Sequence, residues 1–306
     1  MKISKLKNSY FKYAKSFDAT SNQIFLYSGN RVIVLDHTLN FITVINNLKN
    51  VYCGYLSPDK TKLLLPSIEN RFYIVDLNDF TMIKCVINGN YKGNLEGMGC
   101  WGFDSNSVYI PVLNKVSMKS SLRKYNTFDM SFEDFLVEEY WIIHISFIEN
   151  QKKYLIIGLD RDTHYWNLIW FDGKCFKKQL ISGFQDAIIN VKININENTI
   201  SLFGAEDYIE CDFTGNKINR ERIKFLKSQL DINDIIDERI NTVCKSAYYD
   251  YTYIGTDRAL LIVDNIHNKI IGKQKAEFGI TQIYELNDEL IILSSTNATN
   301  VFKVTQ

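Results

Sequence analysis

The sequence has 306 residues, of which 46% are hydrophobic and 23% are charged. These values are ordinary for a globular chain, and they exclude a disordered, collagen-like or coiled-coil protein. The 35 basic and 35 acidic side chains cancel, so no net charge attracts nucleic acid or an anionic membrane. We therefore expect neither nucleic acid nor a membrane as a partner.

The first residues and the cysteines both favour a cytoplasmic location. The segment MKISKLKNSYFKYAKSF has no apolar stretch or cleavage site of a secretory signal. No apolar run approaches the roughly 18 residues that a membrane helix needs. The six cysteines contain no C-x-x-C pair and have no neighbouring histidine. Since metal and redox motifs need such spacing, we expect reduced cysteines that pack as small hydrophobic residues.

A repeat organises the chain. A β-rich run ends in an acidic or amide residue followed by a turn, at steps of 40 to 52 residues, and this step matches a four-stranded propeller blade. About fifteen to twenty residues earlier, a polar tight turn joins two apolar runs, which predicts a hairpin. The six residues that end these runs are Asp36, Asp76, Asn126, Asp172, Asp212 and Asp264.

In chain order the repeat predicts seven blades, each with strands a to d. In the first blade we expect strands over Phe11–Phe17, Gln23–Tyr27, Arg31–Leu35 and Phe41–Ile45. The last blade has only three predicted strands, so Met1–Leu6 supplies the fourth and removes an exposed sheet edge. The predicted blades cover residues 11–50, 51–96, 97–141, 142–186, 187–238, 239–278, and 279–306 together with 1–10.

The sequence therefore predicts an all-β chain that forms a single seven-bladed β-propeller domain closed by its N-terminal strand. A six-bladed ring is the structural alternative. Ser131–Tyr140 fits a capped helix as well as strand d. Glu221–Leu230 places Ile223, Leu226 and Leu230 on one helical face, which predicts a short helix inserted between blades five and six.

The turn Ser57-Pro58-Asp59-Lys60-Thr61-Lys62, followed by Leu63, resembles the turn between strands a and b of WD40-like and YVTN-type propellers. The six c-strand endings resemble a degenerate form of the Trp-Asp signature. The resemblance covers essentially the whole chain, although the dipeptides Trp-Asp and Gly-His never occur. The chain is thus similar to a divergent WD40-like seven-bladed propeller, and the resemblance implies no functional residues.

Catalytic and cofactor motifs fail on spacing. The glycines of Asn88–Gly99 do not form a phosphate-binding loop, and no nucleophile signature lies in a suitable strand–turn–helix context. We interpret His37 and His267 as solvated turn residues and His144 as a hydrogen-bonded residue of an innermost strand. We therefore predict no catalytic residues, no metal and no cofactor.

The longest connections predict a binding face. They are Asn88–Gly97, Asn114–Ser121, Leu159–Trp166 and Phe225–Arg239, and all four belong to the b–c loops and blade-to-blade connections that share one face. Trp166 is interpreted either as an exposed anchor or as a cap on the core of blade four. The predicted partner-binding residues, from adjacent blades three and four, are Lys115, Lys119, Arg161, His164, Tyr165 and Trp166.

These features favour a non-enzymatic, monomeric scaffold that binds a protein or peptide through its loop-rich face. The alternative is a propeller enzyme, of the hydrolase or lactonase type, with its site at the mouth of the central channel. Such a site needs several polar groups that converge on the axis. The inner strands read mostly apolar, as in GMGCWGF and VYCGYL, which favours the scaffold.

Overall fold

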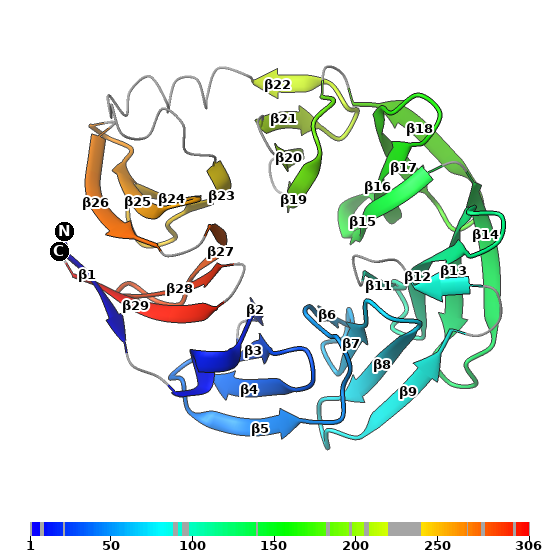
Figure 1. Cartoon of the computed structure of the whole chain (residues 1–306), viewed down its shortest axis with the longest axis horizontal. Helices are drawn as coiled ribbons and strands as arrows, with labels where there is room; N and C mark the ends of the chain where they lie inside the picture. The colour runs from blue at the N-terminus through cyan, green and yellow to red at the C-terminus, as the bar shows by residue number, and fades with distance from the viewer. Residues whose placement is uncertain are drawn as a thin grey trace.

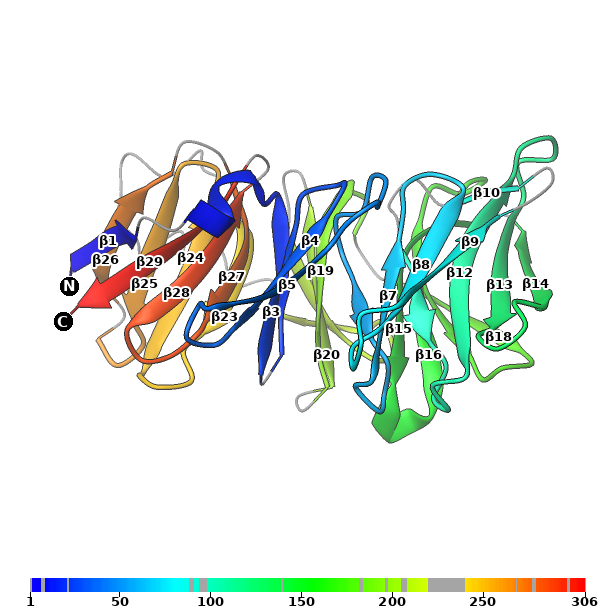
Figure 2. The same ribbon diagram turned by 90° about the horizontal axis from the view of Figure 1, so that it is seen from below.

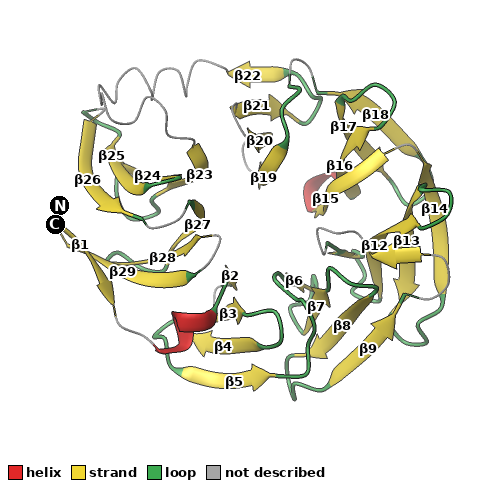
Figure 3. Cartoon of the chain, in the orientation of Figure 1, coloured by secondary structure: helices red, strands yellow, loops and turns green. Residues whose placement is uncertain are grey.

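The computed structural model shows seven antiparallel sheets arranged around a ring (Figure 1). Strands dominate the described residues, as Figure 3 shows, and the seven-bladed β-propeller is confirmed. The structure describes residues 2–6, 9–20, 22–87, 91–93, 98–138, 140–181, 184–195, 198–204, 208–219, 240–267, 269–276, 279–295 and 298–305.

Each blade is one sheet, and its strands follow one another from the channel outward. Blade one consists of β2 (Ser16–Ala19), β3 (Gln23–Tyr27), β4 (Val32–Asp36) and β5 (Phe41–Ile45). Blade two consists of β6 (Tyr55–Leu56), β7 (Lys62–Pro66), β8 (Arg71–Asp76) and β9 (Met82–Val86). Blade three consists of β10 (Tyr91–Gly93) with β11 (Cys100–Trp101), β12 (Ser107–Asn114), β13 (Ser120–Asn126) and β14 (Phe132–Glu138). Blades four and five consist of β15 (Tyr140–Ile148), β16 (Lys153–Asp160), β17 (Trp166–Phe171) and β18 (Phe176–Leu180); and β19 (Ile188–Asn194), β20 (Thr199–Gly204), β21 (Tyr208–Asp212) and β22 (Lys217–Asn219). Blades six and seven consist of β23 (Ile240–Lys245), β24 (Tyr251–Thr256), β25 (Ala259–Asp264) and β26 (Lys269–Lys275); and β27 (Ile280–Glu285), β28 (Leu290–Ser295), β29 (Thr299–Thr305) and β1 (Lys2–Leu6).

The N-terminal strand closes the ring, as the sequence predicts. β1 pairs antiparallel with β29 over five residues, from Lys2 opposite Thr305 to Leu6 opposite Val301. Ile3 packs against the core between blades six and seven, and Leu6 packs against the core between blades seven and one. The two ends of the chain thus complete one sheet and cover an edge that β29 would otherwise expose.

The hydrophobic core is divided into clusters that lie between neighbouring blades. On β3, Phe25 and Tyr27 pack toward blade two, whereas Ile24 and Leu26 pack toward blade seven. Alternate residues of a strand point to opposite faces of its sheet, and in this ring both faces are covered by another blade. This burial explains why the middle strands read as continuous apolar runs such as VIVL and LLIV.

The repeated Asp or Asn at the end of strand c closes the turn to strand d. In each of the six turns its Oδ1 accepts the backbone N–H two residues further on, at N–O distances of 2.8–2.9 Å. Asn126 makes the same hydrogen bond as the five aspartates, which shows that the turn needs the oxygen rather than the charge. The repeated Asp or Asn in the sequence therefore marks a side chain that stabilises its own c–d turn. The predicted polar tight turns, such as those at 57–60 and 287–289, also fall between strands a and b.

Two segments differ from the prediction, and a third decides between two alternatives. Ser9–Tyr13 is a 3-10 helix, η1, so the first inner strand starts at Ser16 rather than Phe11. The expected loop Asn88–Gly97 includes β10, which pairs with β12 as part of the inner strand of blade three. For Phe132–Glu138, where the sequence leaves strand d and a helix open, the structure shows strand d, in which Asp134 lies opposite Arg123 and forms an ion pair with it at 2.6 Å. The predicted helical insert at Glu221–Leu230 lies outside the described residues.

The connections gather at two opposite faces of the ring (Figure 2). We call the face with the a–b and c–d turns the turn face, and the face with the b–c hairpins and blade-to-blade connections the loop face. Within the described ranges the helical elements are η1 and η2 (Glu149–Gln151), and no helix has the length and hydropathy to cross a membrane.

Deletion of residues 1–8 should destabilise the whole ring. The deletion removes the β1–β29 pairing, with its five opposed residue pairs, and the half-buried side chains of Ile3 and Leu6. We expect the free energy of unfolding to fall by about 2 kcal/mol or more from the lost apolar burial alone. Denaturant unfolding measures this change, and Ser4→Ala, at an exposed position of the same strand, is the control. An unchanged unfolding midpoint for the deletion would show that β1 does not hold the ring closed.

Candidate functional site

The two predicted b–c loops are tight turns at the ends of long hairpins. Residues 115–119 join β12 to β13, and residues 161–165 join β16 to β17. Asn114 and Asp160 accept backbone N–H groups of these turns, at 2.9 and 3.0 Å, as the aspartates of the c–d turns do. Met118 and His164 close the turns with φ values of 57° and 56°. The rim residues are thus held by rigid turns, and the expectation of long loops at these two positions was wrong.

The two hairpins are in contact on the loop face. Arg161 Nη2 donates a hydrogen bond of 3.3 Å to Ser120 Oγ across the boundary between blades three and four. Arg161 is half-buried, whereas Lys115, Lys119 and His164 are exposed. The two predicted segments are therefore in contact, and the Arg161–Ser120 hydrogen bond fixes one hairpin against the other.

Trp166 is a core residue and not an exposed anchor. It is 4% exposed, it packs in the cluster between blades four and five, and its indole N–H donates to the Asp186 carbonyl at 2.7 Å. Of the two interpretations left open by the sequence, the structure supports the one in which Trp166 caps the core of blade four. The reason is its position as the first residue of β17, where the side chain turns inward beneath the exposed turn.

Sequence reasoning missed three exposed apolar side chains beside these rim residues. Val116 and Met118 lie in the β12–β13 turn and are 77% and 47% exposed. Trp141, at the start of β15, lies opposite Leu159 in the sheet and is 44% exposed. Tyr165 is 41% exposed. Their position in a polar turn or at a strand end was visible in the sequence, but their exposure depends on how the blades pack. We name the blade 3–4 rim for the exposed residues Lys115, Val116, Met118, Lys119, Trp141, His164 and Tyr165, with the half-buried Arg161.

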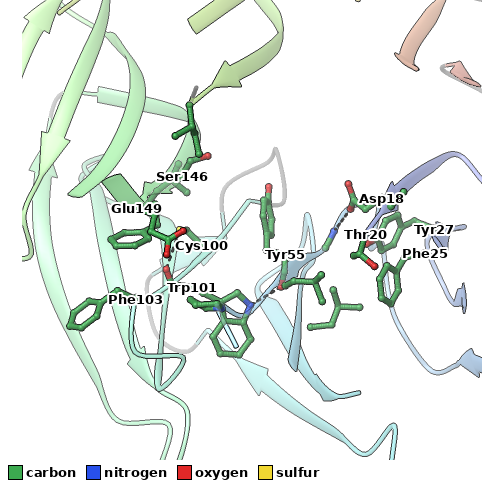
Figure 4. Close-up of a pocket in the computed structure, with 18 of the residues that line it drawn as sticks. Asp18, Thr20, Phe25, Tyr27, Tyr55, Cys100, Trp101, Phe103, Ser146 and Glu149 are labelled. Atoms are coloured by element: carbon green, nitrogen blue, oxygen red, sulfur yellow. Dashed lines mark hydrogen bonds between the residues drawn. The ribbon is translucent and has the colours of Figure 1, made fainter. Parts of the chain in front are cut away.

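The channel mouth on the turn face holds a cavity of about 750 Å³. It is lined by the ends of the inner strands and the a–b turns of blades one to five. Figure 4 shows Asp18 and Glu149 on opposite sides of this cavity, with Tyr55 between them. The wall includes Trp101, whose indole N–H donates to the Tyr55 carbonyl at 2.6 Å. The apolar inner strands expected from the sequence therefore carry a carboxylate at this mouth.

Asp18 is held among groups that are uncharged. Gly54 N–H donates to its Oδ2 at 3.2 Å. A Cβ at position 54 would come within 2.5 Å of the Tyr27 hydroxyl oxygen, so glycine lets the backbone reach the carboxylate. Burial raises the pKa of Asp18 to about 6, and the Tyr27 hydroxyl and the Gly54 N–H oppose this rise. The carboxylate is charged at neutral pH and loses its charge in mildly acidic solution.

His144 and Ser146 are neighbours on the inner strand of blade four. His144 Nε2 lies 2.6 Å from Ser146 Oγ, and Ser146 lines the cavity. Burial lowers the pKa of His144 to about 4, so the imidazole is neutral at physiological pH. This agrees with a hydrogen-bonded inner histidine. His37 and His267 lie in c–d turns, as predicted, where their rings contact the Thr20 carbonyl and the Asp264 carboxylate.

Across the described ranges, no group of three or more His, Cys, Asp or Glu side chains is arranged to hold a metal ion. The predicted long connection Phe225–Arg239 lies outside those ranges.

Comparison with known proteins identifies the fold. No family model matches the chain, and no curated protein sequence matches it. Solved structures do match, among them the β-propeller domain of Cps50 (Swd1) from Myceliophteria thermophila. The TM-score is 0.68 at 10% sequence identity, and the match covers 99% of this chain and 98% of that one. The chain thus has the WD40-like seven-bladed propeller fold.

Because Trp166 is buried and Tyr165 is exposed, replacing Trp166 with alanine should destabilise the protein far more than replacing Tyr165. Trp166→Ala should lower the free energy of unfolding by about 3–5 kcal/mol, because it leaves a cavity and removes the hydrogen bond from the indole N–H to the Asp186 carbonyl. Tyr165→Ala should cost less than about 1 kcal/mol, because the ring is 41% exposed. Trp141→Ala is the matched tryptophan control. Equal losses for the two tryptophan variants in denaturant unfolding would contradict the assignment of Trp166 to the core.

Proposed function

We propose that this protein is a non-enzymatic scaffold that binds a protein or peptide on the blade 3–4 rim. The observation that carries the proposal is the contact of two rigid hairpins at Arg161 and Ser120. A rigid surface loses little conformational freedom on binding, so its contacts convert efficiently into affinity.

The composition of the rim supports a polypeptide partner. Val116, Met118 and Tyr165 offer apolar and aromatic contact area, and their exposure means that a partner can bury them. Lys115 and Lys119 add positive charge beside this area. Methionine, tyrosine and arginine are enriched where proteins bind one another, while surrounding charges orient the partner. Trp166 has no part in the proposed interface, because it is buried.

The proposal includes a cytoplasmic, monomeric scaffold. The six cysteines, all within the described residues, form no disulfide bonds, and reduced thiols are typical of a reducing compartment. Closure by β1 covers the edge of β29, so the ring needs no second copy to complete a sheet.

Peptide selection tests the rim. Peptides are selected from a random displayed library against the immobilised protein, and the affinity of the strongest binder is measured by isothermal titration calorimetry. The double variant Val116→Ser/Tyr165→Ala should weaken binding by about tenfold or more if these side chains are hot spots. The unfolding midpoint should change little, because both positions are exposed.

The matched control removes exposed apolar area from the opposite face. Phe128 and Ile266 lie in c–d turns and are 77% and 68% exposed. The variant Phe128→Ala/Ile266→Ser should leave the affinity unchanged. If the control weakens binding and the rim variant does not, the proposed rim is wrong.

A hydrolase is the second candidate function, and one contact favours it. Ser146 Oγ lines the channel-mouth cavity and lies 2.6 Å from His144 Nε2, which is the spacing of a nucleophile and its base. Against this function, a histidine with a pKa of about 4 is a weak general base at neutral pH. The scaffold therefore accounts better for the structure.

A serine-directed fluorophosphonate probe separates the two functions. The scaffold predicts no covalent labelling of Ser146 at neutral pH, because the neutral, weakly basic imidazole does not activate the hydroxyl. Labelling is read by intact-protein mass spectrometry, and Ser146→Ala is the control. Stoichiometric labelling of the wild-type protein that Ser146→Ala abolishes would establish the hydrolase candidate.

A further inference from the structure

We propose that the channel-mouth cavity binds a lysine or arginine side chain of a partner polypeptide, with the Asp18 carboxylate as its counter-ion. This second site lies on the turn face, opposite the blade 3–4 rim. It shares with the proposed function only the polypeptide nature of the partner.

The first argument is the charge of Asp18. Desolvation raises the pKa of this carboxylate, and the Tyr27 hydroxyl and the Gly54 N–H lower it. No basic side chain is among those that lower its pKa within the described part of the chain. Asp18 is half-buried, and a carboxylate partly removed from water is stabilised when a cation pairs with it, so a bound ammonium or guanidinium would stabilise the ionised form.

The second argument is that the titratable neighbours of Asp18 are neutral. Tyr27 on β3, Cys53 before β6 and Tyr55 on β6 face it, and desolvation raises the pKa of each. The pKa of Cys53 rises to about 12, and that of Cys100 in the same cavity also rises to about 12. The floor of the cavity therefore presents one negative charge at neutral pH. The other charged residues of the lining are Glu149 and Lys152, both exposed in the a–b turn of blade four.

The third argument is the aromatic wall. Tyr55, Trp101, Phe103 and Phe147 line the cavity together with Asp18. Aromatic faces attract cations, and they also pack against the methylene stem of a long basic side chain. A lysine or arginine would thus match the wall along its stem and match Asp18 at its charged end.

The exposed edge of the cavity favours a polypeptide ligand over a small organic cation. Phe103 and Ile195 line the cavity and are 71% and 41% exposed. A small cation bound at Asp18 would leave these side chains in water, whereas the residues that flank a basic side chain in a peptide would cover them. The volume of about 750 Å³ also lies in the range of sites that enclose ligands much larger than one ammonium group.

Pentapeptide pools test the proposal directly. Each pool has an acetylated N-terminus, an amidated C-terminus, randomised flanks, and Lys, Arg, Gln or Glu fixed at the centre. Binding to the wild-type protein is measured by displacement of a fluorescent Lys-centred pool. The Lys or Arg pool should bind about tenfold more tightly than the Gln pool, and the Glu pool should bind most weakly. n-Butylammonium tests a small cation without flanking residues. It should compete at least about tenfold more weakly than the Lys pool if the flanking residues of the peptides cover Phe103 and Ile195.

Asp18→Asn isolates the carboxylate. Asparagine keeps the shape and an oxygen that can accept from Gly54, so we expect the unfolding midpoint to be preserved. The preference for Lys over Gln pools should disappear. Asp288→Asn, at an exposed position in the a–b turn of blade seven, removes the same charge from the same face and should retain the preference.

The pH dependence gives a readout that needs no variant. Because the pKa of Asp18 is raised to about 6, acidification from about pH 7.5 to about pH 5 protonates most of the carboxyl group and should weaken Lys-pool binding by up to about tenfold. The bound cation favours the carboxylate, so the midpoint of the loss should lie below that of the free protein. Glu149 and Lys152 remain in Asp18→Asn, and the binding that this variant retains should vary little over the same range.

Three results would overturn the proposal. They are equal affinity of wild-type protein for Lys and Gln pools, an unchanged preference in Asp18→Asn, and n-butylammonium competing as well as the Lys pool. None of these results bears on the blade 3–4 rim, whose test uses Val116 and Tyr165. Loss of rim binding with an intact Asp18 effect would leave the cavity site standing.

Discussion

The middle strands of this protein must be buried on both faces at once. Phe25 on β3 faces blade two while its neighbour Ile24 faces blade seven, and corresponding strands of the other blades behave alike. A blade with one neighbour would leave one of these apolar faces in water, at a cost of about 1.5–3 kcal/mol for each large side chain exposed. The sheets therefore stabilise one another only as a closed ring. The pairing of β1 with β29 follows from this constraint, since it fixes blade seven to both ends of the chain.

The same constraint leaves the innermost strands free to carry polar groups. They line the channel and do not form the middle of a sheet, so side chains such as Asp18 and Ser146 line the cavity there. Ring closure then brings residues from five blades to one cavity. On the opposite face, the hairpins of blades three and four extend from strands whose packing is already fixed. Both candidate surfaces are thus positioned by the interfaces between blades.

The sequence predicts what local chemistry determines. The Asp and Asn residues that end strand c could be found because each closes its own turn through a hydrogen bond two residues away. Closure by the N-terminal strand was predictable because blade seven lacked a strand. Neighbouring hairpins on blades three and four could also be expected to meet, and Arg161 and Ser120 do.

The features that could not be predicted from the sequence depend on contacts between distant segments. Asp18 looks like one acidic residue in a short strand, and its significance comes from Gly54 and Tyr27 in two other segments. Trp166 follows an exposed turn, so its neighbours in sequence suggest exposure, yet blade five covers it. Strand d of blade three fits a helical pattern, and the cross-strand ion pair of Arg123 and Asp134 accompanies the extended form. A similar fold in a chain with 10% identity agrees with this division, because many apolar residues can fill an interface between blades.

Closure by β1 also has a consequence for the order in which the protein is made. β1 is synthesised before the other described strands, and its partner β29 is synthesised after them. Lys2 and Thr305 are separated by nearly the whole chain, so closing the loop between them has the largest entropic cost among the described strand pairs. During synthesis the first strand must remain unpaired until the last one leaves the ribosome. The ring can close only after β29 has emerged from the ribosome, and until that moment β1 is a short strand with open hydrogen-bonding groups that a chaperone could occupy.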